Sequence, residues 1–191
     1  MPATWRGRRP TALDAVEGLR QLLSEADAED RRLVVAYLDA KRVLASAFES
    51  FAVEQYSDPT VLEETKRRVE AQMRASYAHM SARYLRVRGF GTSHAILIAY
   101  LARSVGTEVS SAELRMLTGD AVHTERRARE LRDLGYDLEA RHTGGADVYV
   151  LRSREADAKA GAAVLVARNI REDRGLSADQ RVELLGRMAR S

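Results

Sequence analysis

The sequence predicts a mainly helical α+β protein, and three observations carry this prediction. Long stretches at both ends of the chain place apolar residues three and four positions apart, which is the spacing of amphipathic helices. Residues 93–151 instead indicate three short helices followed by two strands that meet at Gly144-Gly145. Hydrophobic residues make up 45% of the 191 residues, which is enough for a packed core. We expect a flexible basic arm over residues 1–10, a helical region over 11–90, a central domain over 91–153 and a C-terminal helical extension over 154–191.

The first ten residues and the helix after them open the chain. Residues 1–10 hold Trp5 and three arginines among a glycine and two prolines, so we expect a mobile tail or, alternatively, a basic arm that follows a DNA backbone. A helix is expected to start at Thr11 or Asp14. Its apolar side would carry Leu13, Val16, Leu19, Leu22 and Leu23.

Two further helices are predicted after the acidic residues 25–30. From Leu33 to Phe51 the apolar residues alternate at spacings of four and three, which is a heptad seam that needs a partner helix. Asp58 as cap and Pro59 at the first helical position then begin another helix, which continues to about residue 87. We expect these two helices to form an antiparallel hairpin, packed within the chain or completed by a second copy. The corresponding hypothesis is a homodimer built on the N-terminal helices.

The central stretch begins with three short helices. The first has Ser93 as its N-cap and stops at Gly106, and Ser110 with Glu113 has the spacing of a capping box for the second. Asp120 is expected to cap the third helix, residues 121–134. At 100° per residue, one side of that helix holds Ala121, Thr124, Ala128 and Leu131, and the opposite side holds His123, Arg126, Arg129 and Glu130, with Arg127 on its flank.

Two strands and two more helices complete the chain. A strand over residues 137–142 is followed by Thr143-Gly144-Gly145 and by a return strand with period-two and β-branched signals. Beyond Leu151, residues 155–173 indicate one helix, and Ser177 is expected to cap a terminal one.

The residues from Glu125-Arg126-Arg127-Ala128-Arg129-Glu130 through Leu134-Gly135-Tyr136, followed by the hairpin and Tyr149-Val150-Leu151, carry a resemblance. This pattern resembles the winged helix-turn-helix modules of bacterial DNA-binding proteins, including modules beside His-Asn-His (HNH) endonuclease domains. The resemblance covers about a third of the chain. It implies a winged helix DNA-binding domain over residues 91–153 that binds double-stranded DNA, in a transcriptional regulator or in the recognition module of a restriction or defence system.

A second, shorter resemblance lies near the C-terminus. Residues 174–187 look like the lead-in to the metal-binding core of some HNH endonucleases. No paired His, Asn or Cys-x-x-Cys follows them in this sequence, so the nuclease chemistry has no residues here to carry it. The alternatives are therefore an accidental likeness, a degenerate relative, or the recognition part of a longer HNH-type nuclease.

The DNA-contacting residues follow from the usual placement of a recognition helix. The N-terminal part of that helix approaches base edges, so His123 and Arg126 are candidates for base contacts. The remaining candidates are backbone contacts from the helix and the wing, namely Arg127, Arg129, Arg132, Arg141, His142, Thr143 and Gly144, with possible phosphate contacts from Arg83, Arg86 and Arg88. The competing interpretation is a salt-bridged surface helix on a protein-interaction or assembly module that never meets DNA.

Composition excludes several other classes of protein. The net charge of +3 is modest for a nucleic-acid binder, and residues 94–152 hold eight basic against nine acidic residues. The chain has no apolar run of membrane-spanning length and no secretory pattern near Met1, so we expect a cytoplasmic protein without a membrane contact. With no cysteine and four scattered histidines, we predict no structural metal and no cofactor. The common nucleotide-binding and hydrolase motifs do not occur, so we do not expect an enzyme.

Overall fold

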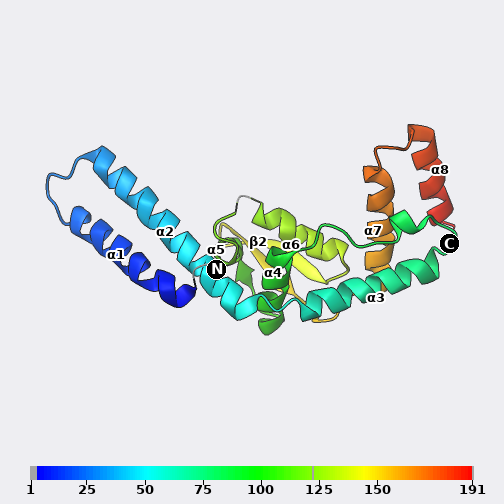
Figure 1. Ribbon diagram of the computed structural model, residues 1–191, viewed down its shortest axis with the longest axis horizontal. Coiled ribbons are helices and arrows are strands. Elements are labelled where there is room, and N and C mark those ends of the chain that lie inside the picture. The colour runs from blue at the N-terminus through cyan, green and yellow to red at the C-terminus, as the bar shows by residue number, and fades with distance from the viewer. Residues whose placement is uncertain (1–3, 122, 191) are drawn as a thin grey trace.

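The computed structural model describes residues 4–121 and 123–190, and these form an elongated, mainly helical chain with one small antiparallel sheet (Figure 1). This confirms the predicted fold class. In chain order the elements are α1 (Trp5–Leu23), α2 (Asp30–Tyr56), α3 (Thr60–Ser76), the 3-10 turn η1 (Ala82–Tyr84), α4 (Thr92–Arg103), β1 (Val109–Ser110), α5 (Ser111–Leu117), α6 (Thr124–Asp133), β2 (Leu138–Thr143), β3 (Ala146–Leu151), α7 (Ala158–Glu172) and α8 (Ala178–Met188). Among the described residues, no helix is both long enough and apolar enough to cross a membrane.

The N-terminal arm expected over residues 1–10 is helical from Trp5 onward, so that expectation was wrong for the part of it that the structure describes. Thr4 caps α1 by accepting a hydrogen bond from the Gly7 amide at 3.1 Å, and the Trp5 ring packs on Phe48 of α2 at 5.3 Å between ring centroids. The cap and the aromatic contact together hold the first turns in place. Residues 1–3 of the predicted arm lie outside the described residues.

The partner of α2 is α1 and not the helix that follows it. The α1–α2 hairpin extends away from the rest of the molecule, whereas α3 runs toward the opposite end and packs on α7 (Figure 1). The predicted hairpin between the heptad helix and the next helix was therefore wrong. The break at residues 57–59 turns the chain. The N-cap of α3 is Pro59 and not the predicted Asp58, whose carboxylate accepts from the Thr60 amide at 2.9 Å in the turn before the helix.

The helix α3 ends at Ser76, earlier than the predicted residue 87. The chain then turns back along α3, where the Val87 amide donates to the Glu70 carboxylate at 3.0 Å. Tyr84, Leu85 and Val87 are all buried, although no α-helix continues over these residues. Arg83 lies in the 3-10 turn η1, and Arg86 and Arg88 lie on the irregular segment after it.

The central stretch folds as helix, strand, helix, helix and hairpin, with the sheet order β1-β3-β2. The predicted capping box starts α5, because the Ser110 hydroxyl accepts from the Glu113 amide at 3.2 Å and the Glu113 carboxylate accepts from the Ser110 amide at 2.7 Å. The pairing of Thr143 with Ala146 leaves a two-residue turn. Gly144 and Gly145 have φ angles of 60° and 80°, which suit glycine in such a turn.

The helix α6 starts at Thr124, three residues later than predicted, and Asp120 does not cap it. Asp120 has a left-handed φ of 59°, and its amide donates to the Arg115 carbonyl at 2.9 Å, so it closes α5 instead. The Thr124 hydroxyl donates to the Ala121 carbonyl at 2.9 Å and lies 2.7 Å from the Thr118 hydroxyl. These buried hydroxyls fix the turn between α5 and α6.

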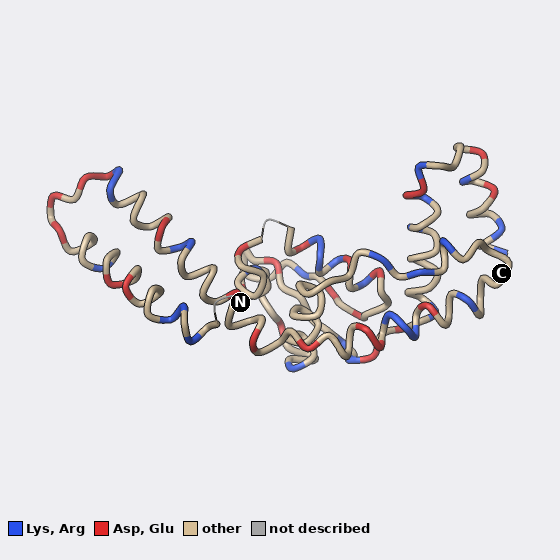
Figure 2. The backbone as a smooth tube through the Cα atoms, in the orientation of Figure 1, with Lys and Arg blue, Asp and Glu red and all other residues tan. Residues whose placement is uncertain are grey.

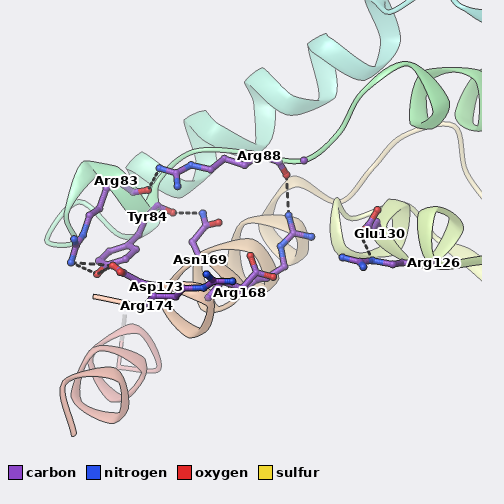
Figure 3. Close-up of a pocket in the computed structure, with 11 residues that line it drawn as sticks. Arg83, Tyr84, Arg88, Arg126, Glu130, Arg168, Asn169, Asp173 and Arg174 are labelled. Atoms are coloured by element: carbon purple, nitrogen blue, oxygen red, sulfur yellow. Dashed lines mark hydrogen bonds and ion pairs between the residues drawn. The ribbon is translucent and has the colours of Figure 1, made fainter. Parts of the chain in front are cut away.

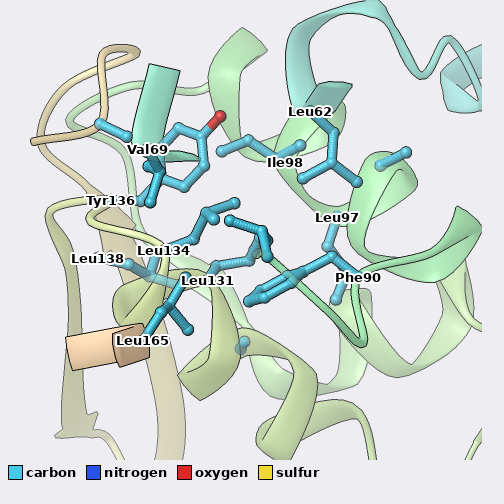
Figure 4. Packing of buried hydrophobic residues seen from close by; sticks show 14 of the residues in the cluster. Leu62, Val69, Phe90, Leu97, Ile98, Leu131, Leu134, Tyr136, Leu138 and Leu165 are labelled. Atoms are coloured by element: carbon cyan, nitrogen blue, oxygen red, sulfur yellow. The ribbon is translucent and has the colours of Figure 1, made fainter. Parts of the chain in front are cut away.

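The helix α7 belongs to the same hydrophobic core as the central elements. Figure 4 shows Leu62 of α3, Leu97 of α4, Leu131 of α6 and Leu165 of α7 around one interior. The backbones of α6 and α7 come unusually close at Gly161, where a Cβ atom would lie 2.5 Å from the Leu134 carbonyl oxygen. After α7, Ser177 caps α8 as predicted, accepting from the Gln180 amide.

Candidate nucleic-acid interface

The exposed side of α6 is basic. Thr124, Ala128 and Leu131 are buried, as predicted from their spacing, and Arg126, Arg129 and Arg132 are exposed on the other side. His123 is also exposed and precedes the first turn, whereas Arg127 is half-buried. Among the described residues, the buried Nε of Arg127 has no hydrogen-bond partner.

The carboxylates of α6 are mostly engaged by neighbouring elements. Glu125 pairs with Arg115 of α5, its carboxylate accepting from the Arg115 Nε at 2.7 Å. Glu130 accepts from His94 of α4 at 2.8 Å and also from Arg126 at 3.1 Å. Asp133 faces Arg168 of α7 at 3.6 Å.

Because these carboxylates pair with other elements, they neutralise few of the arginines on α6 itself. The pair Arg126–Glu130 is the i,i+4 ion pair found along the described part of this helix. For Arg129 and Arg132, no ion pair or hydrogen bond occurs among the described side chains. Their positive charges lie near Tyr149 of β3, where they act to lower its pKa against a larger increase caused by burial. The outer surface of α6 therefore carries more available positive charge than its sequence suggests.

The hairpin β2–β3 carries the other predicted contacts. The Glu139 carboxylate holds both Arg141, at 2.9 Å from Nη2, and Arg152, at 2.6 Å. Hydrogen bonds from Arg141 and then Arg152 lower the pKa of Glu139 to about 2. His142 faces Asp147 at 2.9 Å, and Thr143 and Gly144 form the exposed tip. A Cβ atom at Gly144 would meet nothing within 4 Å, so the tip is open to an approaching surface.

A cleft of about 530 Å³ lies beside α6, between the segment 83–89 and α7 (Figure 3). Arg83 and Arg88 line it, while Arg86 is not among its lining residues. The lining also includes Tyr84, Gly89, Arg126, Glu130, Arg168, Asn169, Glu172, Asp173 and Arg174. Arg83 and Arg88 of this segment and Arg126 of α6 therefore line one cleft, and Figure 2 shows the charged positions along the backbone.

The cleft wall is fixed by hydrogen bonds from α7 to the segment 83–88. The Asn169 amide donates to the Tyr84 and Arg86 carbonyls, each at 2.9 Å, and Arg168 donates to the Arg88 carbonyl at 3.0 Å. The Tyr84 hydroxyl donates to Asp173 at 2.8 Å. These contacts give this segment a defined position although it has little regular structure of its own.

His94 of α4 contacts Glu130, which lines the cleft. The side chain is buried, its Nδ1 accepts from the Gly91 amide at 3.3 Å and its Nε2 faces Glu130, which is the neutral tautomer with a proton on Nε2. Burial lowers the pKa of His94, against the contact with Glu130, which acts to raise it. Burial acts to raise the pKa of Glu130, but hydrogen bonds from His94 and Arg126 outweigh it, so that the pKa is lowered.

Sequence reasoning missed His94, Arg168, Asn169 and Arg174. Their neighbours in sequence give no signal, because the segment 83–89 and α7 meet through tertiary contacts alone. The described residues contain no group of three or more His, Asp or Glu side chains that could hold a metal ion.

Comparison with known proteins relates the middle of this chain to a restriction enzyme. Residues 94–165 match the family described as the KpnI N-terminal domain. The match begins at His94 in α4, includes α6 and the hairpin, and ends within α7. It is consistent with an association with restriction systems. Neither the curated proteins nor the solved structures give a match to the chain.

Proposed function

We propose that residues 92–151 form a winged helix that binds double-stranded DNA, with α6 as the recognition helix and the β2–β3 hairpin as the wing. The element order and the sheet order β1-β3-β2 support this assignment. The match to a restriction-enzyme domain over residues 94–165, which include most of the proposed winged helix, supports a recognition role in a restriction or defence system, ahead of a transcriptional regulator. The single observation that carries the proposal is the exposed arginine surface of α6, whose carboxylates are engaged by other elements.

The contacts divide between base reading and backbone binding. The pair Arg126–Glu130 is exposed at the arginine end, and such helical pairs contribute about 0.3–0.5 kcal/mol. A bidentate arginine contact to guanine discriminates by about 1–3 kcal/mol, so Arg126 gains by exchanging Glu130 for a base. We assign base contacts to His123 and Arg126. Backbone contacts are assigned to Arg127, Arg129, Arg132, Arg141, His142, Thr143 and Gly144.

We further propose that this chain recognises DNA and does not cut it. The carboxylates near α6 are held by arginine or histidine, which suits a binding surface. Plasmid incubated with the protein and Mg²⁺ should remain supercoiled. Nicking or linearisation in proportion to protein would contradict this part of the proposal.

Selection from a pool of randomised duplexes tests the proposal. An enriched motif is expected, and Arg126→Ala should relax the preference at one base pair while Arg141→Ala weakens all duplexes by a similar factor. Equal losses on every sequence for Arg126→Ala would refute its base-reading role. No enrichment, and no loss for either variant, would refute DNA binding through this surface.

The α1–α2 hairpin supports a second function, homodimer formation. Leu13 and Leu23 of α1 are 60% and 67% exposed, and Val34 and Leu38 of α2 are 57% and 52% exposed. Within one copy, these apolar side chains of the α1–α2 hairpin stay exposed to solvent. Two copies of the hairpin can bury them against each other as a four-helix bundle. A second copy is the occupant we propose, because it brings the same two apolar helix surfaces and would present two copies of α6 to two DNA half-sites.

Light scattering tests the dimer. The chain mass is 21.3 kDa, and the parent protein is expected at twice that mass at micromolar concentration. Leu38→Asp should give single-chain mass without unfolding, since the side chain is exposed in one copy. Val182→Asp is the matched control, because Val182 is 71% exposed on α8, and it should remain dimeric. A parent protein of single-chain mass, with and without DNA, would contradict this proposal.

A further inference from the structure

We infer that the cleft between α6, the segment 83–89 and α7 is a binding site for phosphate groups. The inference rests on the proposed function in one respect, namely that the phosphates of the bound duplex are their expected source. The site shares Arg126 with the base-reading side of α6, and it adds residues of α7 and of the turn after it that the winged helix does not include.

The charges of the cleft favour an anion. Five arginines and three carboxylates line it, and two of the carboxylates already have partners inside the protein. Glu130 is held by His94 and Arg126. Asp173 is held by the Tyr84 hydroxyl and by Arg83 at 3.2 Å. The remaining arginines therefore exceed the remaining carboxylate, Glu172.

Two of these guanidinium groups, those of Arg88 and Arg174, have no carboxylate partner among the described residues. Arg88 donates to the Arg83 carbonyl at 3.1 Å, which is a neutral acceptor. Arg168 donates to the Arg88 carbonyl and is paired with Asp133 at 3.6 Å, so its charge is partly neutralised. For Arg174, no ion pair or hydrogen bond is found within the described part of the chain, and it lines the same cleft as Arg168 (Figure 3). Adjacent guanidinium groups repel one another, and an anion between them removes that repulsion.

The shape of the cleft favours phosphate over an apolar ligand. A guanidinium group binds phosphate oxygens through two parallel N–H donors, and the cleft presents several such groups from separate elements. The polar lining and the absence of a deep apolar wall among the lining residues do not suit an aromatic or aliphatic molecule. Its volume of about 530 Å³ admits more than one phosphate group.

The position of the cleft relates it to the duplex. Arg126 belongs both to the exposed side of α6 and to the cleft lining, so a duplex on α6 passes its backbone beside the cleft. Arg168 and Arg174 would then clamp phosphates that flank the base pairs read by α6. The same chemistry would also hold a free polyphosphate, and two separate measurements distinguish these sources.

Two double variants with equal charge change test the inference. Arg88→Ala with Arg174→Ala removes cleft arginines, and Arg67→Ala with Arg171→Ala removes exposed arginines of α3 and α7 that are not among the cleft-lining residues. Duplex affinity is measured by anisotropy over a range of salt concentrations. For each phosphate that the protein no longer neutralises, the slope of log affinity against log salt should fall by about 0.9. The cleft variant is expected to show this smaller slope and the control to keep the slope of the parent.

In a second experiment, inorganic tripolyphosphate is added in the absence of DNA, and its binding is measured as a rise in the thermal midpoint of unfolding. The two double variants could have equal salt slopes with duplex DNA while tripolyphosphate raises the thermal midpoint of the parent and the control but not of the cleft variant. That result would support a phosphate site whose ligand is a free polyphosphate. If the parent binds no duplex, the proposed function fails, and the tripolyphosphate arm alone decides the cleft. Equal behaviour of the two double variants in both arms would overturn the inference.

Discussion

The close approach of α6 and α7 at Gly161 predicts an unusual response to alanine. In the interior of a helix, alanine stabilises by about 1 kcal/mol relative to glycine, so Gly161→Ala should stabilise α7 considered alone. In the folded chain the added Cβ would lie 2.5 Å from the Leu134 carbonyl oxygen and 2.8 Å from its carbon. Both are backbone atoms at the end of α6, and they cannot rotate away as a flexible side chain would.

The magnitude follows from these opposing effects. Overpacking a core by one methyl group costs about 1–3 kcal/mol, and the absence of a movable neighbour puts this contact toward the upper end. When the gain in helix propensity is subtracted from this cost, we expect Gly161→Ala to lower the free energy of unfolding by about 1–2 kcal/mol. A shift of α7 would also move Arg168 and Asn169, which form the cleft wall.

Urea unfolding followed by circular dichroism measures the effect. Gly186→Ala is the matched control, because Gly186 lies in α8 and its Cβ would meet only the Arg190 side chain at 3.8 Å. The control should be as stable as the parent or more stable by up to about 1 kcal/mol. If Gly161→Ala were stabilised as much as the control, the backbone contact between α6 and α7 described above would be wrong.

Three further predictions concern single contacts. Burial lowers the pKa of His94, so the unfolded state binds more protons and the free energy of unfolding falls as the pH drops below about 6.5. Urea unfolding at pH 7.5 and 5.5 should therefore show a smaller loss of stability for His94→Gln than for the parent. An equal loss in both proteins would contradict the buried neutral imidazole. Tyr136→Phe removes the hydroxyl that lies 2.9 Å from Thr65 and should cost about 1 kcal/mol in urea unfolding, with an unchanged value contradicting that bond. Gly144→Asn should leave the thermal midpoint nearly unchanged, since Asn-Gly also suits this turn, whereas Gly144→Val should lower it; equal midpoints would contradict the left-handed φ at this position.

The features that the sequence predicted well depend on neighbouring residues. The capping box at Ser110, the cap at Ser177 and the turn at Gly144-Gly145 are decided within four residues, and the structure has all three. The buried side of α6 could also be predicted from the sequence, because helical periodicity alone places Ala128 and Leu131 on one side of the helix. Such local choices hold in many tertiary settings.

The features that the sequence did not predict depend on distant partners. A heptad seam shows that α2 needs a partner, yet both flanking helices offered an apolar stripe, and the aromatic contact between Trp5 and Phe48 joins residues far apart in the chain. Asp120 has the side chain of an N-cap, but Gly119 before it is left-handed, and the two residues end α5 instead. Only the structure shows which of two compatible local roles such a residue takes.

The candidate site shows the same division. Arginines on α6 were identified from the helical spacing, whereas Arg168 and Arg174 reach the cleft because α7 packs on α3 and α6. The sequence also did not show that Glu125 and Asp133 form ion pairs with other elements, since it suggested pairs within the helix. Charge counts along a sequence therefore underestimated the positive charge on this surface.

The central claim, that the outer side of α6 binds duplex DNA, is tested most directly by anisotropy titration of a charge-matched pair of double variants. Arg129→Ala with Arg132→Ala removes the two arginines of α6 that have no ion-pair partner among the described residues, and Arg67→Ala with Arg68→Ala removes two exposed arginines of α3. We predict that the α6 variant weakens duplex binding and lowers its salt slope by about 0.9 for each phosphate that it no longer neutralises, while the α3 variant binds as the parent does. Parent-like binding by the α6 variant, or equal losses in both variants, would contradict the claim.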